Sequence, residues 1–206
     1  MGPLPALNVV IISGMVGQLI ILPNAIKRAQ KNVVLSYGGG IFLGVYLGLY
    51  FLFQREIPDI TFFMGIFIIL ATLILVSGWK YKGPVNNFTS CSFGSGIGFF
   101  AGFFGVPTGP LTGLFFLSLK EDIKIIQANI QCIVILTVFA FFTYFYLIEG
   151  FRSDYLLLGL IMSIPLAIGL KTGQYLFTFL PEKIFRPITY ICLVSLGASL
   201  CFNAYN

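Results

Sequence analysis

The hydrophobic pattern divides the chain into long apolar stretches that are separated by short polar and charged loops. Seven stretches are long enough to be membrane helices, and they cover about residues 6–24, 33–54, 61–79, 91–119, 125–148, 155–177 and 185–202. A helix needs about 20 consecutive apolar residues to cross a bilayer. We therefore predict an all-α fold, namely a polytopic membrane helix bundle.

The stretch at residues 91–119 is too long for one plain spanning helix, and its sequence contains a break. Pro107 and Pro110 each lack a backbone N–H donor and push the residue before them out of helical geometry. Glycines at regular spacing on either side of the break provide smooth faces on which helices pack closely. We predict two half-helices, the second of which begins at Pro110 with Thr108 or Gly109 as its N-cap.

A helix break inside an apolar stretch has a functional interpretation. It leaves N–H and C=O groups that lipid cannot satisfy, so protein or a water-filled cavity must surround it. The N-terminus of the second half-helix would present free N–H groups and the positive end of a dipole to an anion, and transporters bind substrates at such broken helices. The alternative is a packing kink, because glycine and proline are common in membrane helices. We favour the binding site.

The composition agrees with a membrane protein and argues against several other classes. The chain has 206 residues, of which 58% are hydrophobic and 9% are charged, and its mean hydropathy is +0.97. The net charge of +5 comes from cations dispersed among short loops, which argues against binding of nucleic acid. The chain has no histidine, no deep acidic residue and four widely spaced cysteines. We therefore expect no metal, no cofactor and no enzyme activity.

The loop charges indicate how the broken stretch is threaded, because cytoplasmic loops are enriched in Lys and Arg. If residues 91–119 cross the membrane once, the loop cations divide almost evenly between the two sides. If the stretch goes in and returns, only Arg55 and Arg152 of the loop cations lie outside. We therefore predict a broken, re-entrant helix hairpin at about residues 91–119, with the N- and C-termini outside the cytoplasmic membrane.

One pattern of residues occurs twice, in the second apolar stretch and in the sixth. The matching residues are Gly44, Gly48 and Tyr50 in the first copy and Gly169, Gly173 and Tyr175 in the second. In the re-entrant topology these two helices cross the membrane in opposite directions, which predicts two inverted repeats. The first half is placed at residues 1–87, with three transmembrane helices, and the second at residues 88–206, with the broken hairpin and three more.

The candidate ligands for an anion are all neutral donors at the break or on the helices expected beside it. They are Gly105, Thr108, Gly109 and Thr112 at the break, Asn129 and Gln131 on the stretch 125–148, and Asn8 as the inverted counterpart of Asn129. Neutral donors allow a bound anion to be released. For Asn129 and Gln131, hydrogen bonding between helices is an equally good interpretation. Lys171, which lies well inside a predicted helix, is close enough to its inner end to snorkel.

A glycine ladder runs into residues 106–111 (VPTGPL), and a short charged loop and an amide-bearing helix follow it. This arrangement resembles the second half of the TauE/SafE family of membrane transporters, and the helices before it resemble the first half. The resemblance implies a two-repeat bundle that moves small sulfur-containing anions, such as sulfite or organosulfonates, across the cytoplasmic membrane of prokaryotes. Each family half starts with its own glycine-rich segment, whereas residues 2–4 (GPL) match only the tail of the first.

We accordingly predict a membrane transporter, either a secondary carrier or a facilitator, for a small anion of the sulfur oxyanion or organosulfonate class. The expected partners are this anion and the lipid bilayer, without nucleic acid, and the chain could also form a homo-oligomer. The alternative is a non-transporting membrane subunit or a truncated remnant of a duplicated transporter. It stays open because the first glycine-rich segment would have to precede Met1.

Overall fold

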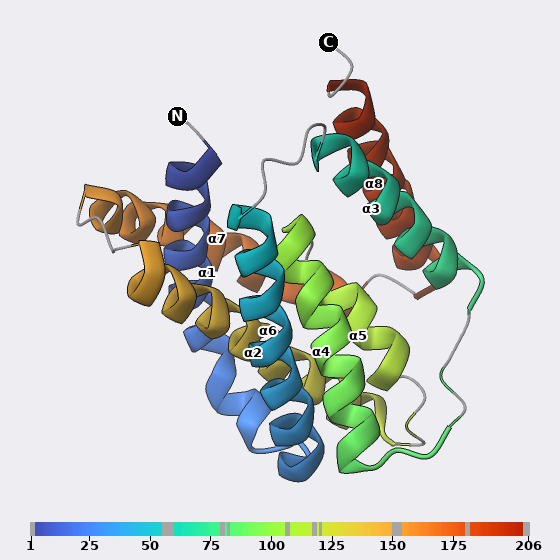
Figure 1. The fold of residues 1–206 in the computed structure, drawn as a ribbon. Helices are drawn as coiled ribbons and strands as arrows, with labels where there is room; N and C mark the ends of the chain where they lie inside the picture. The colour runs from blue at the N-terminus through green and yellow to red at the C-terminus, as the bar shows by residue number, and fades with distance from the viewer. Residues whose placement is uncertain are drawn as a thin grey trace.

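The computed structural model describes residues 3–54, 60–78, 81, 83–105, 108–116, 119, 121–149, 154–179 and 182–203. Within these ranges the regular structure is helical. The helices are α1 (Pro3–Ile26), α2 (Lys31–Gln54), α3 (Ile60–Val76), α4 (Asn87–Phe104), α5 (Thr108–Phe116), α6 (Ile123–Tyr144), α7 (Asp154–Phe179) and α8 (Glu182–Asn203), and a π-helical turn, η1 (Phe145–Glu149), extends α6 (Figure 1).

Several of these helices have the length and hydropathy of membrane spans. Those long and apolar enough to cross a bilayer within the described ranges are Lys31–Gln54, Ile123–Ile148 and Tyr155–Gly173. Shorter apolar helices occupy Val9–Leu19, Thr61–Val76 and Tyr190–Phe202. The predicted all-α membrane bundle is therefore confirmed.

Helices α2 and α4 pack with their backbones in direct contact. The facing glycines are Gly40, Gly44 and Gly48 on α2 and Gly94, Gly98 and Gly102 on α4. A Cβ atom on Gly44 would overlap the carbonyl oxygen of Ser95, and one on Gly94 would overlap that of Tyr37. Only glycine permits this approach, so the regular spacing seen in the sequence forms the tightest seam of the bundle.

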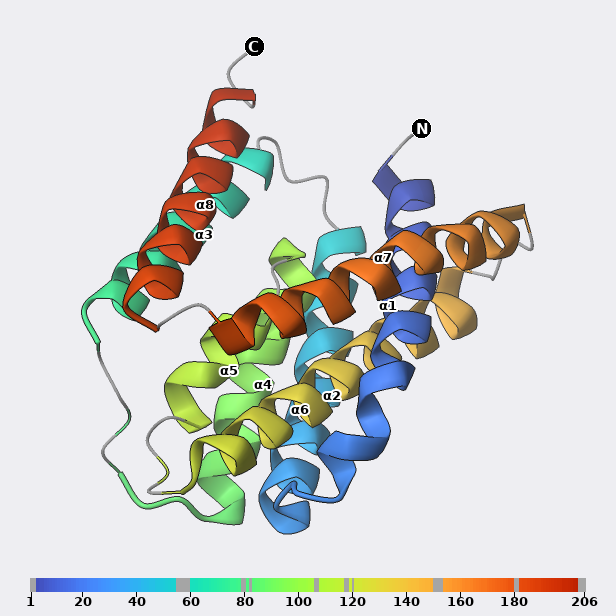
Figure 2. The same cartoon turned by 180° about the vertical axis from the view of Figure 1, so that it is seen from behind.

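The contacts of α2 show that α4 and α6 run in the same direction. The glycines of α2 meet α4 in ascending order along both helices, so α2 and α4 are parallel. Gly38 and Tyr46 of α2 meet Leu136 and Tyr144 of α6 in the same order, so α2 and α6 are parallel as well. Helices α4 and α6 therefore begin at the same end of the bundle, and the chain returns between them through α5 (Figure 2). The predicted return of the chain at the break is therefore confirmed.

Side-chain caps mark the beginnings of α4 and α6 at this shared end. Asn86 Oδ1 accepts a hydrogen bond from the backbone N–H of Thr89 at 2.8 Å, and Thr89 Oγ1 accepts one from the N–H of Asn86 at 3.0 Å. Asp122 Oδ1 accepts one from the N–H of Lys124 at 3.2 Å, before α6. Such caps satisfy N–H groups that the first turn of a helix leaves free.

The remaining helices form two further groups. Helix α1 packs against both α6 and α7, and Gly17 of α1 lies against Leu166 and Leu170 of α7. Helices α3 and α8 pair through Gly65 and Gly197. Both views show this pair to one side of the other helices (Figures 1 and 2).

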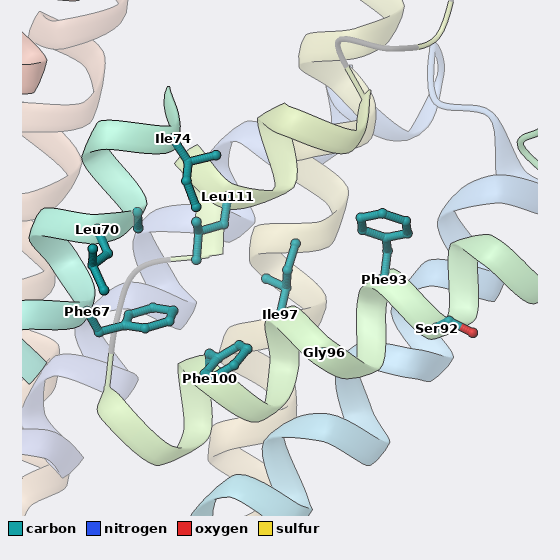
Figure 3. Close-up of a pocket in the computed structure, with 10 residues that line it drawn as sticks. Phe67, Leu70, Ile74, Ser92, Phe93, Gly96, Ile97, Phe100 and Leu111 are labelled. Atoms are coloured by element: carbon teal, nitrogen blue, oxygen red, sulfur yellow. The ribbon is translucent and has the colours of Figure 1, made fainter. Parts of the chain in front are cut away.

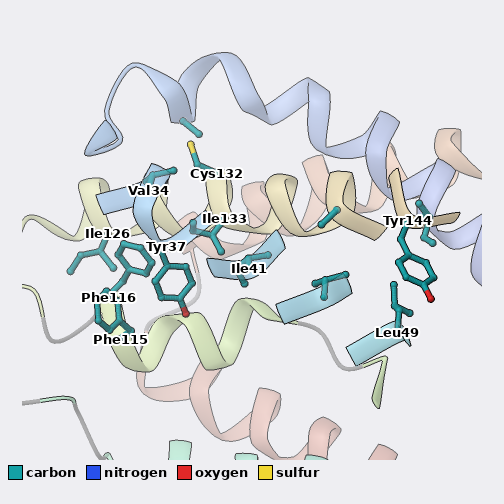
Figure 4. Packing of buried hydrophobic residues seen from close by; sticks show 14 of the residues in the cluster. Val34, Tyr37, Ile41, Leu49, Phe115, Phe116, Ile126, Cys132, Ile133 and Tyr144 are labelled. Atoms are coloured by element: carbon teal, nitrogen blue, oxygen red, sulfur yellow. The ribbon is translucent and has the colours of Figure 1, made fainter. Parts of the chain in front are cut away.

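The buried core lies between α2, α5 and α6, and it holds α5 inside the bundle. Its largest fully buried apolar and aromatic side chains are Tyr37, Phe115, Phe116, Phe145, Ile41, Leu49, Ile133 and Val45 (Figure 4). The ring of Tyr37 packs against Phe115 and Phe116, with 5.2 Å between centroids in each pair. A helix of 9 residues is about 13 Å long, so α5 is too short to cross a bilayer.

Candidate functional site

The break lies where the prolines predicted it, although the second half-helix starts earlier. Gly105 ends α4 in the left-handed conformation, with φ of 62° and ψ of 24°, which favours glycine. Helix α5 begins at Thr108, so the predicted start at Pro110 is two residues too late. The first N–H groups of a helix have no partner within it, and Pro110 therefore fits the first turn without losing a hydrogen bond. Residues 106–107 lie outside the described ranges.

The start of α5 is buried at mid-depth in the bundle. Thr108 is 4% exposed, and its hydroxyl oxygen lies 3.3 Å from that of Thr137 on α6. Thr137 donates its own proton to the carbonyl of Ile133 at 2.8 Å, so Thr108 is the donor to Thr137. Thr137 lies near the middle of the apolar span Ile123–Ile148. The positive end of the α5 dipole therefore lies among protein side chains, as an interior anion site requires.

One turn further along α5, Thr112 is fully buried close to Tyr37 of α2. The two side chains interact, but neither hydroxyl has a partner with hydrogen-bonding geometry. In the part of the chain that the structure describes, the hydroxyls of Tyr37 and Thr112 are the buried side-chain oxygens that make no hydrogen bond of good geometry. Figure 4 shows the Tyr37 hydroxyl directed towards α5. A buried polar group without a partner costs about 1–3 kcal/mol, so this pair requires an explanation.

Tyr37 is a candidate that the sequence interpretation missed. Its signal was the spacing to the glycine ladder, because Tyr37 precedes Gly40 by three residues and Gly44 by seven and so lies on the same helix face. That face meets α4 and, through the Tyr37 side chain, α5. A tyrosine on this face of α2 is expected to be buried, and its hydroxyl is then buried as well.

Asn129 is fully buried nearer the end at which α6 begins, and its amide is engaged with Gln30. Asn129 Oδ1 accepts a hydrogen bond from the backbone N–H of Gln30 at 2.8 Å, and Asn129 Nδ2 donates one to Gln30 Oε1 at 3.2 Å. Gln30 Nε2 in turn donates to Glu121 Oε1 at 2.9 Å. These bonds join the segment after α1 to α6, which supports the helix-linking interpretation of Asn129.

The other candidate residues lie apart from this buried group. Gly109 is half-buried, and a Cβ atom there would lie 3.8 Å from the side chain of Val134. Gly105 is exposed. Gln131 is half-buried and, two residues from Asn129, cannot share its helix face. The side chain of Asn8 lies outside the described part of the structure.

We expect Asn129→Leu to lower the free energy of unfolding by about 2 kcal/mol, because it leaves the backbone N–H and the side chain of Gln30 without their buried partner. Thermal unfolding in detergent micelles measures the change. Gln127→Leu is the matched control, since Gln127 is exposed on the same helix. Equal melting temperatures for the two variants would show that the Asn129 bonds do not stabilise the fold.

An apolar cavity lies on the other side of α4 and α5, facing α3 (Figure 3). Its volume is about 610 Å³, and it is lined by Phe67, Leu70, Ala71, Ile74, Ser92, Phe93, Gly96, Ile97, Phe100 and Leu111. Among these residues only Ser92 has a polar side chain. Such a lining offers an anion almost no hydrogen bonds, so the polar group formed by Thr108, Thr112 and Tyr37 is the better candidate site.

The family model described as sulfite exporter TauE/SafE matches residues 2–200. The chain belongs to this family. TauE/SafE proteins are membrane transporters of sulfur-containing anions such as sulfite, so the chain is a multi-pass membrane transporter, in agreement with its apolar helices. A transporter family also fits the prediction that the chain is not an enzyme. No curated protein and no solved structure matches the chain.

Proposed function

We propose that the chain carries a small sulfur oxyanion or organosulfonate across the cytoplasmic membrane, as a secondary carrier or a facilitator. The observation that carries this proposal is the N-terminus of α5, buried at mid-depth beside the hydroxyls of Thr108 and Thr137. The anion would rest against the free N–H groups of the first turn, and Thr108 would turn its hydroxyl from Thr137 to the anion. Gly105, Gly109, Thr112, Asn129, Gln131 and Asn8 remain proposed contributors.

The proposed site contains neutral donors, which suits transport. Helix α5 has no charged residue, and neither do α2 beyond Lys31 and α6 beyond Lys124. A buried cation would hold an anion tightly and slow its release, whereas dipoles and hydroxyls allow exchange.

We also propose that residues 1–87 and 88–206 are inverted halves that meet at this site, with both termini outside. An axis in the membrane plane would exchange α1 with α6, α2 with α7 and α3 with α8. Helix α1 is antiparallel to α6, and α3 is antiparallel to α8. The pair α1–α7 is parallel, as is the corresponding pair α6–α2. A twofold axis in the membrane plane reverses the direction of every helix, so these are the helix directions expected of inverted halves.

A second candidate function, that of a subunit completed by another membrane helix, is favoured by the glycines of α7. No atom of the described residues lies within 4 Å of a Cβ placed on Gly169 or Gly173. Their counterparts by sequence pattern, Gly44 and Gly48, are covered by α4. A helix that packs on α7 as α4 packs on α2 would fill this face.

Anion flux into vesicles reconstituted with the purified full-length protein tests the proposed function. We expect saturable flux of sulfite or of methanesulfonate, and little flux of acetate, relative to protein-free vesicles. Flux that does not exceed the protein-free level for any of these anions would contradict transport by this chain alone and favour the subunit.

A further inference from the structure

We propose that the hydroxyls of Tyr37 and Thr112 form a second resting position for the transported anion, and that this position takes singly charged but not doubly charged oxyanions. The inference rests on the proposed transport function. It adds a second binding position on the transport path and a preference for singly charged anions.

The two hydroxyls lack the partner that an oxyanion would supply. Tyr37 and Thr112 are each 0% exposed, and although their side chains interact with each other, neither oxygen makes a hydrogen bond of good geometry in the described ranges. Packing against Phe115 and Phe116 holds the Tyr37 ring, so its hydroxyl is directed inwards and away from water. An oxyanion accepts hydrogen bonds from both hydroxyls, and bonds to a charged acceptor are stronger than those between neutral groups.

This pair lies between the helix break and one end of the bundle. Thr112 is one turn, about 6 Å, beyond Thr108 along α5 and away from the break. Tyr37 lies six residues, about 9 Å, from the start of α2. At that end stand Asn129 and Gln30, in front of the exposed basic segment that follows α1. An anion leaving the α5 N-terminus in this direction would therefore meet Tyr37 and Thr112 next.

The position is closed in this structure, because both hydroxyls are completely buried. An anion reaches them only when α5 moves relative to α2. The contacts that must change are the hydrogen bond between Thr108 and Thr137 and the packing of Tyr37 on Phe115 and Phe116. Transporters open such positions in turn as their helices shift.

The charge preference follows from the absence of a cation among the described residues of these elements. Helix α5 is uncharged, and Lys31 and Lys124 lie in the first turns of α2 and α6. The cost of moving an ion from water into a medium of low dielectric grows with the square of its charge, so a dianion costs about four times as much as a monoanion of equal size. Two hydroxyl dipoles offset part of the cost of removing a monoanion from water. They offset a much smaller share of that cost for a dianion.

Methanesulfonate and sulfate test the charge preference, because they have similar shapes and keep charges of −1 and −2 at neutral pH. We expect the full-length protein in phosphatidylcholine vesicles to carry methanesulfonate at least about tenfold faster than sulfate, since a tenfold ratio needs only about 1.4 kcal/mol of discrimination. Equal flux of the two anions, faster flux of sulfate, or flux of sulfite with neither of them would overturn the preference.

Removal of each hydroxyl tests the position. We expect Tyr37→Phe and Thr112→Val each to lower methanesulfonate flux about tenfold or more, because each removes one hydrogen bond to a charged acceptor. Thr112→Ser keeps the hydroxyl and should retain the flux. Tyr46→Phe removes a hydroxyl on the same helix as Tyr37, from a ring that packs edge-on against Tyr144, and should behave as wild type.

A structural role is distinguished by the melting temperature. Because neither hydroxyl makes a hydrogen bond of good geometry among the described residues, Tyr37→Phe and Thr112→Val should lower flux without lowering the melting temperature. A loss of flux that accompanies a loss of stability would show that the hydroxyls are structural. Unchanged flux in both variants would remove the second position but leave the proposed function intact, whereas a wild type that moves no anion would remove the function itself.

Discussion

Gly44→Ala is expected to separate α2 from α4 and to lower the free energy of unfolding by about 3 kcal/mol or more. The added methyl group would overlap the carbonyl oxygen of Ser95, which is a backbone atom and cannot rotate away. The two helices must therefore move apart along the whole seam, and the contacts of the flanking Gly40 and Gly48 weaken with it. The core that holds α5 depends on α2, so the start of α5 should lose its position as well.

Thermal unfolding in detergent micelles and the yield of monodisperse protein measure this effect. Gly39→Ala is the matched control, because Gly39 is on the same helix and no atom lies within 4 Å of a Cβ placed there. We expect Gly39→Ala to unfold at the wild-type temperature or slightly above it, since alanine favours a helix more than glycine does. A Gly44→Ala protein as stable as the control would mean that α2 and α4 do not pack in this way.

Thr108→Val is expected to lower anion flux by about tenfold or more while the protein still inserts and folds. Valine has nearly the shape of threonine, but it lacks the hydroxyl at the N-terminus of α5. The variant also loses the buried bond to Thr137, which costs stability of only about 1 kcal/mol because Thr137 keeps its bond to Ile133. Flux should therefore fall much more than stability does.

Vesicle flux per folded protein, with sulfite and methanesulfonate as the anions, measures the result. Thr108→Ser restores a hydroxyl at the same place and should recover most of the flux. Thr143→Val serves as the control, because the Thr143 hydroxyl bonds to the carbonyl of Ala140 in its own helix and lies more than one turn beyond Thr137. Wild-type flux in Thr108→Val would exclude the start of α5 as the binding position.

The helix break shows how far local sequence information reaches. Proline geometry placed it correctly, and the distribution of Lys and Arg chose the hairpin over a single crossing. The start of α5 was placed two residues too late, because Pro110 was expected to be the first helical residue although any place in the first turn accepts a proline. Helix boundaries depend on how the helix ends pack, and the Thr108 hydroxyl lies 3.3 Å from that of Thr137 at this end.

The polar residues show where local information ends. Thr108 and Thr112 were found because they lie at the break, whereas Tyr37 was missed because nothing in its own segment signals a partner on α5. Asn129 was identified as either a ligand or a link between helices, and its bonds to Gln30 support the link. In each case the deciding partner lies on a segment far away in the chain.

By itself, the sequence determined the class of the protein, the places of its apolar helices, the break and the return of the chain. These follow from hydropathy, proline geometry and loop charge, which act within a few residues or through the membrane. Only the tertiary structure decided that the α2 and α4 glycines face each other and that Tyr37 meets Thr112. Such contacts depend on the rotation and register of helices that are distant in sequence. The close packing of whole helix surfaces determines this rotation and register.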